Sequence, residues 1–157
     1  MKYFTLDLLD KLSNGFDPER ETYRKRWMEN LTEYWNQFEK YKNRLPARFV
    51  KEYSKHAFHD YIIESINFYK DATRGKHRNN VEINVSSYDN DKFILRYIGV
   101  TKYNTNVNII DPFDDYTFLY SEILPLDNKK MSHEIHFLER NIVYIEFEKI
   151  VFKKVVR

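Results

Sequence analysis

The segment VEINVSSYDNDKFILRYI, residues 81–98, decides the fold that the sequence predicts. Val81, Ile83 and Val85 alternate with polar residues, and apolar residues alternate again from Phe93 to Tyr97. A period of two places successive side chains on opposite faces of a β-strand. The polar residues DND between the two runs are typical of a turn. The segment therefore predicts two antiparallel strands, each with one buried face.

Other parts of the chain extend this pattern on both sides. β-Branched residues favour a strand over a helix at 60–69, although the apolar spacing there fits either. Three further strands are expected at 116–124, 131–138 and 142–152. The segments KDATRGKHRNN (70–80) and YNTNVNIIDPFDD (103–115) are interpreted as loops within the domain. The carboxy-terminal part of the chain thus predicts five or six strands.

The amino-terminal part of the chain has the helical period instead. A short helix is predicted at 5–13, and a long amphipathic helix begins with Asp17 as N-cap and Pro18 at its first position. Its apolar stripe advances in steps of three and four residues, and comprises Tyr23, Trp27, Leu31, Tyr34, Trp35, Phe38, Tyr41 and Leu45. A third helix is predicted from Pro46 to His56, with its apolar side chains facing the core.

Helices followed by antiparallel strands are typical of the α+β class. We expect one domain over residues 1–157, mainly helical at 1–58 and mainly β at 59–157. In this fold the long helix packs on a single antiparallel sheet of five or six strands. The length of 157 residues suits one domain.

Composition excludes several classes of function. The net charge of +2 lacks the broad positive footprint of a nucleic-acid binder. The absence of cysteine excludes disulfides and thiolate chemistry, and three glycines could hardly build a phosphate-binding loop. No apolar run is long enough for a membrane span, and no secretory signal is evident. We therefore expect a cytoplasmic chain with no cofactor and no membrane association, and its composition disfavours a nucleic-acid partner.

The stretch SKHAFHDYIIES (54–65) holds the first candidate site. On a helix, His56 and His59 would share a face, which suits metal ligation or proton transfer, and Asp60 follows directly. The alternative interpretation is structural: His59 and Asp60 end a helix, and the carboxylate binds backbone N–H groups or orients an imidazole. Zinc would also require a third protein ligand.

The motif HEIH, residues 133–136, suggests a second site. Residues three apart on a strand point to opposite faces, so His133 and His136 cannot share one ion. The pattern also differs from the helical H-E-x-x-H motif of zinc proteases. No metal site is predicted at either pair of histidines.

Several of these motifs together resemble a known family. The order of FHD (58–60), YIIESINFY (61–69), DDYTFLYSEI (114–123) and HEIHFLERNIVYIEFEKI (133–150) is similar to that in small uncharacterised bacterial proteins of unknown function. Those proteins have an amino-terminal helical part and a carboxy-terminal β part. The resemblance implies a fold and no activity, and some small proteins with similar β-rich tails look like immunity proteins that neutralise a toxin.

The leading hypothesis is a non-catalytic, immunity-like module that binds another protein. Aromatic residues favour interface hot spots, so the contact residues would include Tyr103, Tyr116 and Tyr120, together with the polar group at 56–60. The first alternative is a metal-assisted hydrolase that uses His59 and Asp60. The second is a nucleic-acid binder that uses the basic segment 70–78.

Overall fold

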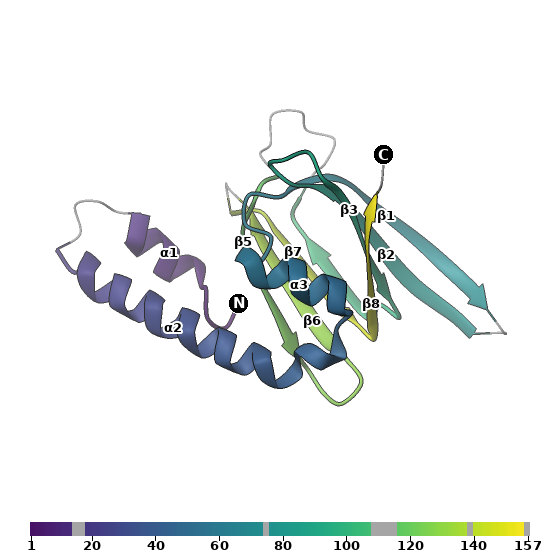
Figure 1. The fold of residues 1–157 in the computed structure, drawn as a ribbon, viewed down its shortest axis with the longest axis horizontal. Helices are drawn as coiled ribbons and strands as arrows, with labels where there is room; N and C mark the ends of the chain where they lie inside the picture. Colours follow the sequence, from purple (N-terminus) through teal and green to yellow (C-terminus); the bar gives the residue numbers. More distant parts are fainter. Residues whose placement is uncertain (14–17, 74–75, 108–115, 138–139, 156–157) are drawn as a thin grey trace.

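The computed structural model of the chain describes residues 1–13, 18–73, 76–107, 116–137 and 140–155. Its helices precede Ala57 and its strands follow Tyr61, so the predicted α+β class is confirmed (Figure 1). The described helices are α1 (Leu6–Ser13), α2 (Arg20–Tyr41) and α3 (Ala47–His56), and a single 3₁₀ turn, Lys42–Arg44, joins the last two. Among them, no helix combines the length and the apolar character needed to cross a membrane.

The described strands form two antiparallel sheets of four strands each, which corrects the expected single sheet of five or six. The first sheet has the order β1-β2-β3-β8, with β1 at Ile62–Thr73, β2 at Lys76–Ser86, β3 at Lys92–Ile98 and β8 at Lys149–Val155. The second has the order β4-β7-β6-β5, with β4 at Lys102–Thr105, β7 at Ile142–Phe147, β6 at Met131–Phe137 and β5 at Phe118–Pro125.

The segment 81–98 forms the expected pair of strands, β2 and β3. Val81, Ile83 and Val85 are each at most 2% exposed, and β3 alternates between buried and half-buried positions. These side chains enter one hydrophobic core to which both sheets and the helices α2 and α3 contribute. The period-two prediction is therefore confirmed where the apolar alternation is strict.

Two missed strand boundaries explain the wrong strand count. The run predicted as one strand at 142–152 is β7 followed by β8, and the chain passes between sheets at Glu148. Opposite it, β3 turns at Gly99 into β4, which the sequence left in a loop. Gly99 has a φ of 68°, and a Cβ there would lie 2.7 Å from the Glu148 carboxyl carbon. Only glycine therefore fits this corner without strain or displacement.

The predicted loop at 70–80 is wrong as well. The pairing of β1 with β2 continues to Thr73 and Lys76, whereas β3 pairs with β2 only as far as Asn80. The two strands therefore project beyond the rest of their sheet as a two-stranded ribbon (Figure 1). A bulge between Ile63 and Ser65 also changes the face of β1. It buries Ile63 and leaves Ile62 46% exposed.

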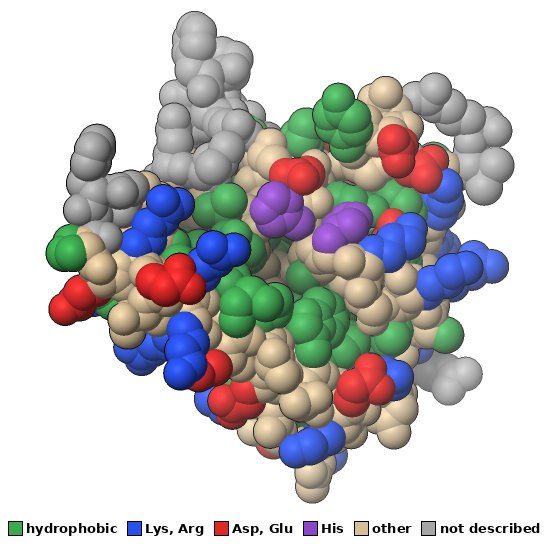
Figure 2. Space-filling view, turned by 60° about the vertical axis from the view of Figure 1, so that its left-hand side comes forward, with side chains coloured by type: hydrophobic (Ala, Val, Ile, Leu, Met, Phe, Trp, Pro, Cys, Tyr) green, Lys and Arg blue, Asp and Glu red, His purple; other side chains and the backbone are tan. Residues whose placement is uncertain are grey.

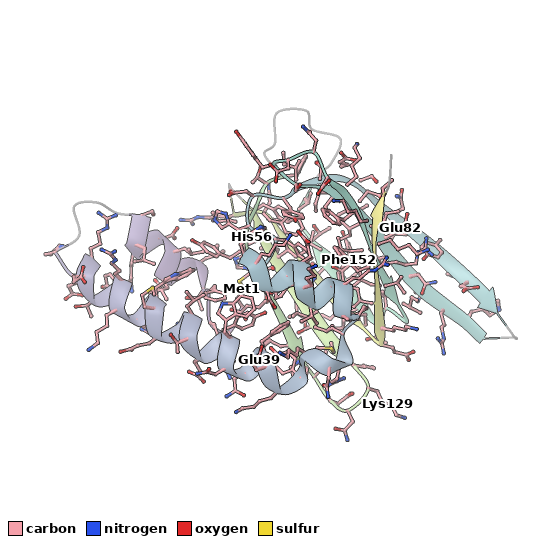
Figure 3. All side chains as sticks on the ribbon, viewed as in Figure 1. Met1, Glu39, His56, Glu82, Lys129 and Phe152 are labelled. Carbon is pink, nitrogen blue, oxygen red and sulfur yellow. The ribbon has the colours of Figure 1, made fainter. Side chains whose placement is uncertain are left out.

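The helices agree with the prediction except at the start of α2. This helix begins at Arg20 instead of Pro18, and the expected cap Asp17 lies outside the described residues. α3 packs on both sheets, because the Phe49 ring lies 5.8 Å from Phe152 of β8 and 6.3 Å from His133 of β6. Figure 3 shows Phe152 beside α3.

Tyrosine hydroxyl groups of α2 and α3 cover the outer edge of β5. Tyr41 donates a hydrogen bond to the backbone oxygen of Ile123, and Tyr34 accepts one from the N–H of the same residue. Tyr53 donates to the backbone oxygen of Ser121 and bonds to the Tyr34 hydroxyl at 2.6 Å. These buried hydroxyls replace the partner strand that a sheet edge otherwise lacks.

We expect Tyr53→Phe to lower the free energy of unfolding by about 1–3 kcal/mol, because it leaves buried polar partners of Tyr53 unsatisfied. Urea unfolding measures this loss. Tyr88→Phe is the matched control, since Tyr88 is 90% exposed. Equal stability of the two variants would contradict the role of the hydroxyl.

Candidate functional site

The residues singled out at the end of α3 form one side of a polar pocket. α3 ends in a left-handed residue, Ala57, whose N–H bonds to the Tyr53 oxygen. Phe58 and Asp60 also have positive φ values, of 60° and 66°. Left-handed backbone is costly for non-glycine residues, and the fully buried Phe58 ring anchors this one. The resulting turn directs His59 and Asp60 to the surface.

This pocket has a volume of about 370 Å³. Its lining comes from two parts of the chain: Glu52, Lys55, His56, His59, Asp60 and Tyr61 at the end of α3, and Ser87, Tyr88, Asp89 and Asp91 between β2 and β3. Figure 2 shows two histidine side chains close together on one face of the molecule, with acidic side chains nearby. The structure thus brings His56, His59 and Asp60 together with residues that lie about 30 positions later in the chain.

Several polar side chains of the pocket are paired with one another. His59 Nδ1 lies 2.9 Å from Asp60 Oδ1, so the carboxylate orients the imidazole. Tyr61 donates a hydrogen bond to Glu52, which also pairs with Lys55 at 2.9 Å. Burial raises the pKa of Glu52, but the bonds from Tyr61 and Lys55 outweigh it and leave that pKa below its ordinary value. Burial, followed by the bond to Glu52, raises the pKa of the Tyr61 hydroxyl.

The pocket orients the His59 imidazole through the Asp60 carboxylate. Within the described ranges, no three His, Cys, Asp or Glu side chains are placed to hold a metal ion.

The three tyrosines expected at the site are separated. The Tyr120 ring lies 5.6 Å from the His59 ring, and burial followed by the charge of Asp60 raises its pKa. Tyr116 is buried, and its backbone oxygen accepts a hydrogen bond from Ile63. Tyr103 lines a different groove, formed by β1, β2 and β4.

The histidines of the HEIH motif lie on opposite faces of β6, as predicted. His133 is fully buried and bonds through Nδ1 to the Tyr97 hydroxyl at 2.8 Å. Burial lowers the pKa of His133 to about 3. His136 bonds instead to Glu134 at 2.9 Å, and Glu134 pairs with the amino group of Met1 at 2.7 Å. Each imidazole therefore has a structural partner of its own.

The basic segment proposed for nucleic-acid binding does not form a loop patch. Lys70 and Arg78 lie on the paired strands of the ribbon, and Arg74 lies outside the described residues. The basic residues of β8 belong to the opposite edge of the sheet from β1. One of them, Lys154, forms an ion pair with Asp91.

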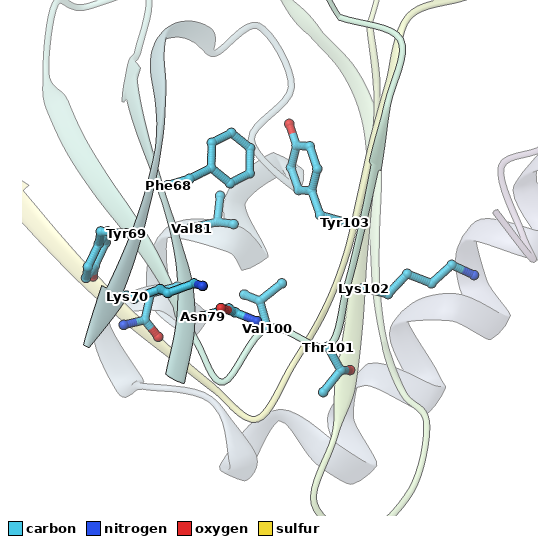
Figure 4. A pocket seen from close by; sticks show the side chains of 10 residues that line it. Phe68, Tyr69, Lys70, Asn79, Val81, Val100, Thr101, Lys102 and Tyr103 are labelled. Atoms are coloured by element: carbon cyan, nitrogen blue, oxygen red, sulfur yellow. The ribbon is translucent and has the colours of Figure 1, made fainter. Parts of the chain in front are cut away.

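Sequence reasoning missed the groove at the fork of the first sheet. There β2 continues into the ribbon while β3 turns into β4, and the backbone bond from Val100 to Asn79 marks the point of divergence. The groove between these parts has a volume of about 420 Å³ and is lined by Phe68, Tyr69, Lys70, Asn79, Asn80, Val81, Val100, Thr101, Lys102 and Tyr103 (Figure 4). The available signal was Phe68, an apolar residue two positions after Ile66 and just before the polar segment 70–80.

Phe68 is the residue that distinguishes this groove. It pairs with Val81, which is 2% exposed, and so belongs to the strand face that forms the core. Phe68 itself is 61% exposed, and its ring meets the Tyr103 ring edge-on at 4.8 Å. A face that is buried elsewhere thus remains accessible between the ribbon and β4.

Comparison of the chain with protein-family models, curated proteins and solved structures gave no match. The resemblance of its motifs to small bacterial proteins stays a prediction.

Proposed function

We propose that this chain is a non-catalytic module that binds another protein, and that the groove between the ribbon and β4 is its binding surface. The observation that carries the proposal is the exposed Phe68 ring on an otherwise buried strand face. Aromatic anchors beside a concave apolar surface are typical of interface hot spots. The sequence resemblance favours an immunity-like form of this function, in which the partner is a toxin.

Charge indicates the kind of segment that the groove accepts. Lys70 has no ion-pair partner among the residues that the structure describes, and it extends toward the side of the groove where Val100 lies (Figure 4). Lys102 points away from the groove in the same view. An extended segment of the partner could place an apolar side chain between Phe68 and Tyr103 and a carboxylate at Lys70. Edge strands such as β1 and β4 also offer backbone groups to such a segment.

The test is an affinity purification from native cells with three baits: the unaltered chain, Phe68→Ser and Tyr88→Ser. We expect a stoichiometric protein that binds the unaltered chain and Tyr88→Ser but is lost with Phe68→Ser. Both aromatic side chains are more than half exposed, so neither change removes a core residue. Lys70→Glu should weaken binding of the purified partner at least tenfold, which corresponds to about 1.4 kcal/mol.

Three results would contradict the proposal. The first is the absence of a stoichiometric partner, and the second is equal retention by the two serine variants. The third is co-purification of nucleic acid, identified by its removal with nuclease, whose binding weakens steeply as the salt concentration rises. This result would favour the nucleic-acid alternative instead.

A further inference from the structure

A second cavity lies between the helices and the second sheet, on other elements than the groove. It has a volume of about 600 Å³ and is lined by Leu6, Leu9, Asp10, Leu12 and Ser13 of α1, Trp27 of α2, Leu119 and Tyr120 of β5, Phe137 of β6, and Arg140. Aliphatic and aromatic side chains make up most of this lining. An apolar cavity of several hundred cubic ångströms with few polar groups is typical of small-molecule sites.

The polar groups of the cavity gather at the last turn of α1. Arg140 Nη2 bonds to Asp10 Oδ2 at 2.7 Å, and the Arg20 Nε donates to the Leu12 backbone oxygen at 3.2 Å. At this rim the Arg140 guanidinium therefore faces the Asp10 carboxylate, while the Arg20 guanidinium bonds to the backbone of the same helix. The Arg140–Asp10 pair is 70% and 50% exposed, and such surface pairs contribute little. An external carboxylate can therefore compete for Arg140 at small cost.

We propose that this cavity binds an amphipathic monocarboxylate, such as a medium-chain fatty acid. The acyl chain occupies the space between Leu9, Leu12 and Leu119, and the carboxylate binds the Arg140 guanidinium in place of Asp10. Arginine suits this role because its planar guanidinium group can donate two parallel hydrogen bonds to one carboxylate. The inference is independent of the protein-binding groove, because no lining residue is shared.

Trp27 provides the readout, since its indole lines the cavity and packs edge-on against Tyr120 at 4.7 Å. The chain has two tryptophans, so Trp35→Phe leaves Trp27 as the sole reporter. In this background we expect decanoate to change the Trp27 fluorescence saturably at submicellar concentration. Affinity should rise about fourfold for each methylene between octanoate and decanoate, as burial of a methylene predicts. Decanol should bind at least tenfold more weakly than decanoate.

Variants of the rim test the carboxylate contact. Arg140→Gln should abolish the preference for decanoate over decanol, and Asp10→Asn should tighten decanoate binding without changing decanol binding. Asp7→Asn is the matched control on the same helix, because the Asp7 side chain is 76% exposed and pairs only with Lys11 among the described ion pairs. The proposal fails if decanoate gives no saturable change, if decanoate and decanol bind equally, or if the two asparagine variants behave alike.

Discussion

Acidification from pH 6.5 to pH 3 is expected to cost this protein about 4 kcal/mol of folding free energy through His133 alone. The folded state lowers the pKa of His133 to about 3, because the imidazole is completely buried. In the unfolded chain its pKa is about 6.5. Between these values the unfolded state binds a proton that the folded state excludes, so stability falls as pH falls. Each unit of difference in pKa corresponds to about 1.4 kcal/mol.

The surroundings of His133 offer nothing that would accommodate the charge. Its Nδ1 bonds to the neutral Tyr97 hydroxyl, and the rings of Phe49 and Tyr53 lie 6.3 Å and 6.0 Å away. Nε2 has no hydrogen-bond partner among the described residues. Burial also raises the pKa of Tyr97, so both partners remain neutral. The pair is therefore a neutral hydrogen bond within an aromatic core.

His133 and the acidic groups affect the free energy of unfolding in different pH ranges. Glu134 has a folded pKa lowered to about 2: burial raises it, but bonds from His136 and the Met1 amino group outweigh that effect. Its contribution is fully present above about pH 4.5 and is lost as pH falls toward 2. Urea unfolding between pH 6.5 and pH 4.5 should therefore show the His133 slope, which rises to about 1.4 kcal/mol per pH unit toward the acidic end of this range.

A double variant tests this assignment. His133→Leu with Tyr97→Phe replaces both members of the bonded pair by apolar groups, which avoids leaving either one unsatisfied. We expect it to flatten the dependence between pH 6.5 and pH 4.5 by about one proton. His59→Leu is the control, because it removes a histidine whose side chain is 39% exposed and keeps the His133–Tyr97 pair. An unaltered slope in the double variant would show that another group causes the acid sensitivity.

The sequence predicts the parts of the fold in which one local pattern dominates. The alternation at Val81, Ile83 and Val85 and the helical stripe through Tyr34 and Phe38 each identify a buried face without tertiary information. The corner at Glu148 is different, because the two successive polar residues Glu148 and Lys149 shift the apolar alternation by one position without showing where the chain goes next. Only the strand pairing shows that the chain changes sheets there, since β7 pairs with β6 and β8 with β3. Local periodicity therefore overestimates strand length and underestimates strand number.

The candidate site was likewise predictable only where it depends on local sequence. The short spacing of His56, His59 and Asp60 was visible in the sequence, and the structural alternative for His59 agrees with its pairing to Asp60. The other wall of that pocket, at Tyr88 and Asp89, could not be predicted, because it depends on where the turn after β2 meets the end of α3. The groove at Phe68 depends on the divergence of β2 from β3, which no local pattern records.

Removal of the Glu122 carboxylate is expected to cost about 3–5 kcal/mol, because it leaves three backbone N–H groups without their acceptor. Glu122 lies on β5 and is 1% exposed. Its oxygens accept hydrogen bonds from the backbone N–H groups of Lys2, Tyr3 and Phe4 at 2.7, 2.6 and 2.7 Å. This carboxylate thus attaches the first residues of the chain to the second sheet.

The attachment also completes an aromatic cluster. The Phe4 ring lies 4.9 Å from Trp27 and 5.4 Å from Tyr34, so release of residues 2–4 would expose rings of α2. We therefore expect Glu122→Ala to lower the urea midpoint and to shift the Trp27 emission to longer wavelength, measured with Trp35→Phe. Glu122→Gln should lower the urea midpoint less than Glu122→Ala does. The glutamine carbonyl oxygen can replace Oε1, the acceptor for the N–H groups of Tyr3 and Phe4.

Glu146→Ala is the matched control from the same sheet. Glu146 is 23% exposed and bonds to the Tyr144 hydroxyl at 3.0 Å, with Lys102 at 4.0 Å. Its loss should cost no more than about 1 kcal/mol, as for other partly exposed pairs. If Glu122→Ala proved no more harmful than this control, the three hydrogen bonds would not hold the amino-terminal residues in place. A loss confined to Glu122 would instead show that one buried carboxylate, far from those residues in the chain, fixes their position against the sheet.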